Sequence, residues 1–162
     1  MTARLARTSD AAEIARIYNQ GIEERNATFE IRHRTTDDVL RWFDGTHPIV
    51  VVEDPGVVAF AATFTYRPRA CYDGIAEVSL YVDQRHRKRG AGRLALSELI
   101  HACERAGFWK LVARIFPDNA GSRALIASHG FREVGVYEKH GRLDGVWKDV
   151  IIIERLIAVN TA

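Results

Sequence analysis

A dense group of cations and glycines separates a strand pattern from a helix pattern near the middle of the sequence. Residues 75–82 alternate between apolar and polar side chains, which predicts a strand with one buried face. Residues 96–103 carry apolar side chains at helical spacing, which predicts an amphipathic helix that begins at Gly90. A strand that passes through one short turn into a helix restricts the chain to folds in which helices cover a sheet.

The turn between these two elements has the chemistry of an anion-binding site. Small residues at Gly90, Ala91 and Gly92 leave the first backbone N–H groups of the helix accessible, and the helix dipole adds about half a positive charge there. The side chains that would add charge-assisted hydrogen bonds to a phosphate are Arg87, Lys88, Arg89 and Arg93. The sequence has neither the dinucleotide fingerprint nor the P-loop pattern. These residues alone leave open a pyrophosphate clamp, a solvated basic turn or a nucleic-acid patch.

The positive charge is local to this turn. The 162 residues include 23 Lys and Arg against 21 Asp and Glu, a formal net charge of +2. Five of the 23 cations lie in residues 84–93, so the remaining 18 are outnumbered by the 21 acids. With 47% hydrophobic and 27% charged residues, the composition predicts one globular domain over residues 1–162 and excludes disordered and collagen-like chains.

The other patterns predict an α/β chain with a mixed sheet flanked by helices on both faces. Asp54-Pro55-Gly56 is a turn sequence between two β-rich runs, and Thr35 or Thr36 is a helix N-cap. The expected strands are 2–7, 49–53, 57–65, 75–82, 109–116, 131–138 and 146–156. The expected helices are 10–23, a short one from 35 to about 45, 90–107 and 119–130, and residues 139–145 are expected to form a loop.

Cysteine usage and apolar runs indicate the compartment. Cys71 and Cys103 are the only cysteines, and no Cys or His spacing suits zinc, so we expect two reduced thiols and no metal. The first eight residues lack the apolar segment of a signal peptide. The longest apolar runs, 49–52 and 150–153, are far below the ~20 residues that span a bilayer. The sequence therefore predicts a cytoplasmic protein without a membrane partner.

Two motifs resemble those of a known family. Arg87-x-x-Gly90-x-Gly92, which follows a strand and opens a helix, is similar to the acetyl-CoA pyrophosphate loop of the GCN5-related N-acetyltransferases (GNAT). Asn119-x-x-Ser122-x-x-Leu125, followed by Gly130-Phe131, resembles that family's second cofactor motif. Within the family, the chain most resembles the phosphinothricin and arsinothricin N-acetyltransferases. The residues that carry this narrower likeness are Ile17-Tyr18-Asn19, Phe29, Arg69, Tyr72, Glu77, Leu80-Tyr81-Val82 and Lys139-His140-Gly141.

The resemblance implies the GNAT fold, with acetyl-CoA as co-substrate and no metal. It implies that the Glu77 carboxylate is the general base and that a backbone N–H at Leu80 polarises the thioester carbonyl. Many relatives carry a Tyr where this chain has Ile126, so Tyr137 and His140 are the alternatives for the general acid. The residues expected to bind acetyl-CoA are Leu80, Tyr81, Val82, Arg87, Lys88, Arg89, Gly90, Ala91, Gly92, Arg93, Asn119 and Ser122.

The implied substrate is the α-amine of a small anionic amino-acid analogue. Arg67 and Arg69 precede the catalytic strand, and a guanidinium fork suits a carboxylate or a phosphinate. We expect Phe29 and Tyr72 to wall the pocket and His140 to donate to the anionic group. The resemblance also implies a homodimer, for which the apolar strand 150–156 is a candidate pairing element.

Three other functions stay open on the sequence. One keeps the fold and changes the amine to methionine sulfone, methionine sulfoximine, an ordinary amino acid, a polyamine or a protein N-terminus; the local arginines disfavour polyamines. Another is an acyl-CoA-binding protein without catalysis, against which Glu77 argues. The last is a nucleic-acid-binding module, which predicts an extended basic face with stacking aromatics rather than one basic turn.

Overall fold

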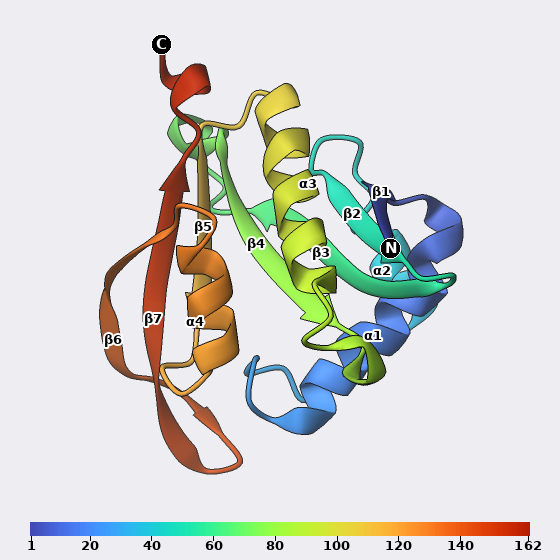
Figure 1. Cartoon of the computed structure of the whole chain (residues 1–162). Coiled ribbons are helices and arrows are strands. Elements are labelled where there is room, and N and C mark those ends of the chain that lie inside the picture. Colours follow the sequence, from blue (N-terminus) through green and yellow to red (C-terminus); the bar gives the residue numbers. More distant parts are fainter.

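A computed structural model of residues 1–162 contains one seven-stranded mixed sheet (Figure 1), as the sequence predicts. The strand order is β1-β2-β3-β4-β5-β7-β6, and only β4 and β5 run parallel. The strands are β1 (Thr2–Leu5), β2 (Ile49–Glu53), β3 (Val57–Thr65), β4 (Ile75–Val82), β5 (Lys110–Ile115), β6 (Arg132–Leu143) and β7 (Val146–Leu156).

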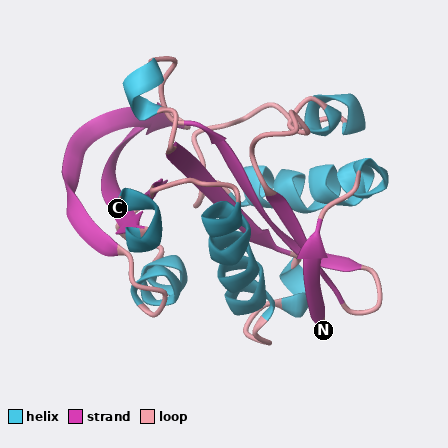
Figure 2. Cartoon of the chain, turned by 90° about the horizontal axis from the view of Figure 1, so that it is seen from above, coloured by secondary structure: helices cyan, strands magenta, loops and turns pink.

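Helices cover both faces of this sheet (Figure 2), which confirms the expected layers. They are α1 (Ala11–Glu24), α2 (Thr36–Leu40), α3 (Ala91–Arg105) and α4 (Ala120–Ala127). One face carries α1 and α2, whose apolar side chains pack around Phe60 of β3. The opposite face carries α3 and α4, in the larger core around Leu99 and Leu111. None of these helices combines the length and the apolar character needed to cross a membrane.

Strands β2 and β3 are apolar on both faces because helices cover both faces of the sheet. Val50 and Val52 of β2 face the α3 side, whereas Val51 faces the α1 side, and all three are fully buried. On β4, Ala76 is buried in the α3 core, with Val78 and Leu80 packed against it, as the alternation predicts. The polar side chains of β4, including Glu77, therefore lie on the α1 side of the sheet.

Strands β4 and β5 pair over only three residues and then separate. Ile75, Ala76 and Glu77 pair with residues 110–112, and no pairing continues beyond Glu77. The Asp83 N–H donates to the Val58 carbonyl on β3, so alternation along the strand turns the N–H groups of Leu80 and Val82 away from β3. We call the resulting gap between β4 and β5 the split. It gives the sheet an opening lined by unpaired backbone groups.

Two sequence-based boundaries are wrong. The short second helix ends at Leu40 rather than near residue 45, although Thr35 caps it by accepting from the Asp38 N–H. Residues 139–145 are not a loop, because β6 continues to Leu143. Asp144 and Gly145 make a two-residue hairpin turn with positive φ at both positions, and such turns match the twist of paired strands.

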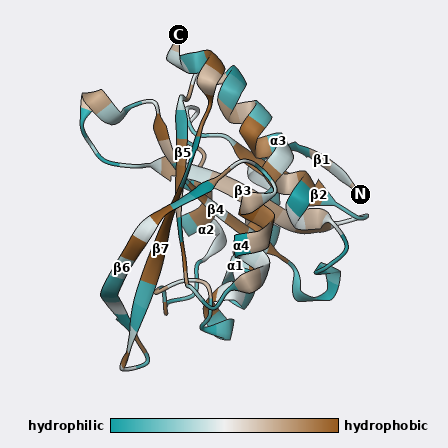
Figure 3. Cartoon of the chain, turned by 60° about the vertical axis from the view of Figure 1, so that its left-hand side comes forward, coloured by the Kyte–Doolittle hydropathy of each residue, from teal (hydrophilic) through white to brown (hydrophobic).

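The long hairpin of β6 and β7 reaches beyond the rest of the sheet (Figure 3). A bulge places residues 138–140 of β6 opposite Asp149 of β7, and the Asp149 carboxylate accepts from the Lys139 N–H at 2.7 Å. Strand β7 pairs with β5 on one side and β6 on the other. Residues 150–156, the candidate pairing element of a homodimer, therefore lie in an interior strand, and β6 is the edge strand.

Candidate active site

Two cavities meet at the split between β4 and β5. The first, of about 610 Å³, passes from the α1 face of the sheet to the α4 face. The second, of about 490 Å³, lies at the basic turn. The residues that line both are Ala27, Leu80, Tyr81, Asn119, Ser122 and Leu125. The sheet opening thus connects the proposed anion site with the side of β4 that carries Glu77.

The basic turn presents unpaired backbone donors at the start of α3. Gly90 is the N-cap with a φ of +91°, a conformation that favours glycine. The first backbone bond of the helix runs from the Leu94 N–H to the Gly90 carbonyl, so the N–H groups of residues 91–93 have no backbone acceptor. A Cβ at Gly92 would lie 3.3 Å from Leu125 and 3.4 Å from Val82. The glycine therefore lets β4, α3 and α4 meet closely around the cavity.

The cations of the turn do not all face the second cavity. Arg87, Lys88 and Arg93 line it, together with Gly90, Ala91 and Gly92. Arg89 lies outside its lining, with its guanidinium 3.6 Å from the Asp54 carboxylate in the β2–β3 turn. The predicted set of cofactor contacts is thus brought together at one site except for Arg89.

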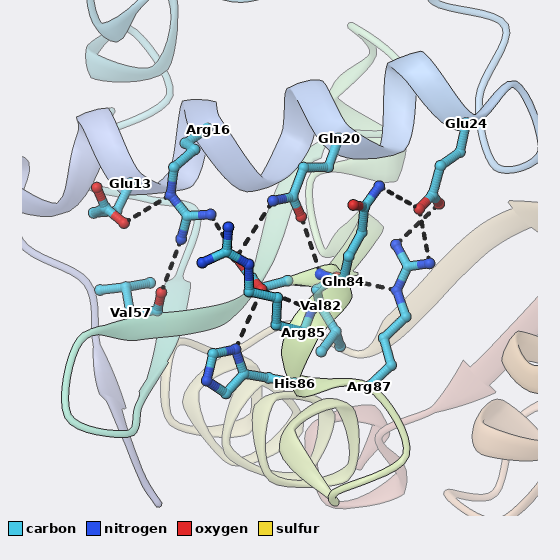
Figure 4. Close-up of polar contacts among 11 residues, drawn as sticks. Glu13, Arg16, Gln20, Glu24, Val57, Val82, Gln84, Arg85, His86 and Arg87 are labelled. Carbon is cyan, nitrogen blue, oxygen red and sulfur yellow. Dashed lines mark hydrogen bonds and ion pairs between the residues drawn. The ribbon is translucent and has the colours of Figure 1, made fainter.

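A polar network fixes the turn to α1 (Figure 4). The buried Asp83 carboxylate accepts from Arg16 of α1 and from the Arg85 N–H, and it contacts the His86 ring. Burial raises the pKa of Asp83, but these contacts, led by the Arg16 hydrogen bond, outweigh burial and hold that pKa well below its usual range. The turn is therefore held in place before any anion arrives.

The second predicted motif also lies at the cavities. The Asn119 side chain caps α4 by accepting from the Ser122 N–H at 3.2 Å, and both residues line both cavities. Capping and ligand contact are compatible for an amide side chain, which keeps its NH₂ group for another acceptor. Ile126 lines the first cavity and offers no proton.

Glu77 faces the first cavity beside an arginine that sequence reasoning missed. The side chain of Glu77 is 29% exposed, and its Oε1 lies 3.4 Å from Nη1 of Arg114 on β5. Both residues line the cavity on the α1 face of the sheet. A carboxylate that is accessible within a cavity can accept a proton from a bound amine.

Aromatic side chains enclose the α1 side of this cavity. Tyr18, Trp42 and Phe64 form one wall, with ring centroids 5.6 Å apart for Tyr18 and Trp42 and 5.1 Å apart for Trp42 and Phe64. Burial raises the pKa values of Tyr18 and Tyr81, which keeps both phenols neutral. The wall is therefore uncharged and apolar, apart from its hydroxyl groups.

His140 reaches the cavity because of the bulge in β6. Lys139 adopts a φ of +46°, and His140, which follows it, lines the first cavity. Tyr137 does not line this cavity, but its ring centroid lies 4.7 Å from that of His140. Phe29 lines the cavity and packs on Phe116 at 5.0 Å, with Gly141 directly beneath it. Of the two candidate general acids, only His140 faces the site.

The predicted substrate residues of the β3–β4 connection lie outside both cavities. Arg67, Arg69 and Tyr72 line neither cavity. The Arg67 guanidinium stacks over the Tyr66 ring at 5.3 Å, and Tyr72 packs edge-on against the same ring at 5.7 Å. Phe29, Glu77 and His140 are thus brought together, and the two arginines are not. One feature of the sequence pointed to Arg114. It alternates with the apolar Leu111 and Ala113 along β5, which places its side chain on the opposite face of the strand.

Comparisons with known proteins identify the class of protein that this fold and site define. The sequence model of the acetyltransferase (GNAT) family matches residues 14–131, and the chain belongs to that family. It is an acetyl-CoA-dependent N-acetyltransferase.

Relatives of this chain align over nearly their whole lengths. The chain is 33% identical to an L-methionine sulfoximine/L-methionine sulfone acetyltransferase of Salmonella typhimurium, over 95% of this chain and 93% of that protein. It is 32% identical to a phosphinothricin N-acetyltransferase of Streptomyces viridochromogenes, over 91% of this chain and 82% of that protein. It superposes with a TM-score of 0.88 on a phosphinothricin acetyltransferase of Sinorhizobium meliloti solved with AcCoA. The two are 28% identical, and the match covers 96% of this chain and 87% of that protein.

The residues at the split fit acetyl-CoA. Unpaired N–H groups at the start of α3 and the cations of the turn suit a pyrophosphate. The outward N–H groups of Leu80 and Val82 suit an amide-containing arm that lies along the strand. The cavity then continues through the split to Glu77.

Proposed function

We propose that this enzyme acetylates the α-amine of a small amino-acid analogue of the phosphinothricin type, with Glu77 as general base. The observation that carries the proposal is the continuity of the two cavities through the split, which connects a pyrophosphate-type site with an accessible carboxylate. The names of the relatives support the same substrate class.

The cofactor side of the site would hold acetyl-CoA by its phosphates and its amide-containing arm. Arg87, Lys88 and Arg93 supply cations, and the first N–H groups of α3 supply uncharged donors. The Leu80 N–H would donate to the thioester carbonyl oxygen as negative charge develops there, and such a donor can be worth ~10²–10³ in rate. When bound, acetyl-CoA supplies an acetyl group activated as a thioester.

The substrate side of the site would carry out the proton transfers of the reaction. Glu77 accepts the proton that the substrate ammonium must lose before its nitrogen forms the new C–N bond. The C–S bond breaks as that bond forms, and a thiol with a pKa of about 8.5 is an acceptable leaving group. The attacking nitrogen still carries one proton more than an amide and releases it to His140, which faces the cavity, or to water, and the same group gives a proton to the departing sulfur.

A second candidate substrate class is supported by the aromatic wall. Tyr18, Trp42 and Phe64 are apolar and uncharged, which suits the neutral chain of methionine sulfone or sulfoximine. Arg67 and Arg69, which were expected to bind a carboxylate or a phosphinate of the substrate, line neither cavity. Phosphinothricin would rely on His140 for this contact.

A homodimer remains part of the proposal, with the edge strand as its interface. Every residue of β6 from Arg132 to His140 is exposed, and large apolar side chains gather on this strand and at the start of β7. They are Val134, Val136, Tyr137, Val146 and Trp147. An unpaired edge strand with apolar side chains favours association. Light scattering should give a molar mass twice that of one chain. A variant in which these apolar side chains are replaced by polar ones should have the molar mass of one chain.

An amine panel tests the proposed reaction. Purified protein with acetyl-CoA should release free thiol in the presence of L-phosphinothricin, L-methionine sulfoximine or L-methionine sulfone. Mass spectrometry should then find the N-acetylated amino acid. Binding of acetyl-CoA without thiol release from any member of the panel would instead support a non-catalytic acyl-CoA-binding protein. Specific DNA binding at physiological salt would revive the nucleic-acid module.

A further inference from the structure

Arg114 is a guanidinium in the first cavity whose hydrogen-bonding capacity is almost unused. Its only ion pair is with Glu77, at 3.4 Å, and its side chain donates no hydrogen bond within the chain. Its side chain is 45% exposed and lines the cavity. A guanidinium has five N–H donors, so this side chain retains several donors for a ligand in the cavity.

The other arginine of this cavity, Arg34, already has partners within the chain. Arg34 donates to the Arg32 carbonyl at 2.7 Å and lies 2.7 Å from the Glu30 carboxylate. Its guanidinium also stacks over the Tyr18 ring at 5.8 Å, and its side chain is 16% exposed. A substrate anion would have to break these contacts to use Arg34, whereas Arg114 is free to bind.

The distance between Glu77 and Arg114 matches the charges of an α-amino acid. An α-amino acid carries its ammonium and its carboxylate on one carbon, so the two groups lie within about 3 Å of each other. Placed beside this pair, the ammonium would face Glu77 and the carboxylate would face Arg114. The charges would then alternate around the site, and the carboxylate would meet the forked donors in the geometry that arginine favours.

We propose that Arg114 binds the α-carboxylate of the substrate and thereby restricts the enzyme to amino acids with a free carboxylate. This inference rests on the proposed function, since it assigns one substrate contact within the same site. It replaces the expected role of Arg67 and Arg69, neither of which lines the cavity. A simple amine, or an amino acid blocked at its carboxylate, lacks the group that Arg114 would hold.

The test compares binding of L-methionine sulfone and its α-carboxamide to the protein by NMR titration, without turnover. The two ligands differ only at the carboxylate. Arg114→Ala should weaken binding of the acid roughly 10- to 100-fold and change binding of the amide less than about three-fold. Arg114→Lys, which keeps the charge but loses the fork, should fall between these values. Arg142→Ala is the matched control, because Arg142 stacks over Trp147 on the hairpin, outside the cavity.

Several outcomes would overturn the assignment. They are no measurable binding of the acid to the wild type, equal affinity of the wild type for acid and amide, or an equal loss for both ligands in Arg114→Ala. Because the readout is binding, it separates this inference from the reaction. A carboxylate-dependent loss in a protein that releases no thiol would support the inference and contradict the proposed function.

Discussion

Glu24 on α1 and Arg87 in the basic turn form an ion pair at the wall of the second cavity, with Oε1 of Glu24 2.8 Å from Nη1 of Arg87. The Arg87 Nε also donates to the Val82 carbonyl at 3.3 Å. Gln84 donates to the same Glu24 carboxylate at 2.7 Å. The end of α1 and the end of β4 are thus tied together beside the second cavity (Figure 4). One acid of α1 holds a cation of the turn in place, with donors still free for a phosphate.

Arg87→Ala should raise the KM for acetyl-CoA roughly ten-fold with little change in kcat. A charge-assisted hydrogen bond at a half-exposed position is worth about 1–1.5 kcal/mol, and the contact is remote from the reacting atoms. Arg89→Ala is the matched control in the same turn, since Arg89 faces Asp54 outside the cavity, and it should change KM less than about two-fold. Equal effects of the two substitutions would show that the turn acts only through its general charge.

Gly21→Ala should destabilise the fold where α1 crosses β4. A Cβ at Gly21 would lie 2.4 Å from the Tyr81 ring, so the helix or the ring must move. Overpacking of this kind costs about 1–3 kcal/mol, and the better helix propensity of Ala offsets part of it. We expect a net loss of about 1–2 kcal/mol in urea unfolding. Gly121→Ala, in α4 with nothing within 4 Å, should cause no loss.

Asp83→Asn should lower the free energy of unfolding at neutral pH but not in acid. The pKa of Asp83 in the folded protein is below its unfolded value of about 3.9, so its stabilisation is present above that value and is lost as the pH falls through the folded pKa. The Arg16 partner is 42% exposed, which limits the loss at pH 7 to about 1–2 kcal/mol. Urea unfolding at several pH values should show the wild-type advantage shrinking below about pH 4. A constant difference would contradict this account.

Patterns within short stretches of sequence predicted the strand bounds, turns and helix caps, because neighbouring residues determine these features. The bounds of β2 and β3 follow from two β-rich runs and the turn at residues 54–56, and those of β4 follow from alternation. The motif glycines and Asn119 lie where a strand-turn-helix signature places them. The hairpin turn at Asp144-Gly145 was also a local signal, and reading it would have extended β6 to its true length.

The rest of the site depends on contacts that are distant in sequence. Arg114 becomes a site residue only because β5 leaves β4 after residue 77, and no pattern within β5 reveals that separation. Arg67 and Arg69 lie in an irregular connection, where no period fixes the direction of a side chain. The aromatic wall combines α1, the turn after α2 and β3, which meet only through tertiary packing.

Glu77→Gln tests the central claim most directly, through kcat/KM for the best amine of the panel between about pH 6 and 9. We expect a loss of ~10²–10⁴ in kcat/KM, because the amide cannot accept the ammonium proton, with acetyl-CoA binding unchanged by calorimetry. The remaining activity should rise with pH as more of the amine becomes free in solution. A variant with wild-type kcat/KM across this range would contradict the assignment of Glu77 as the base.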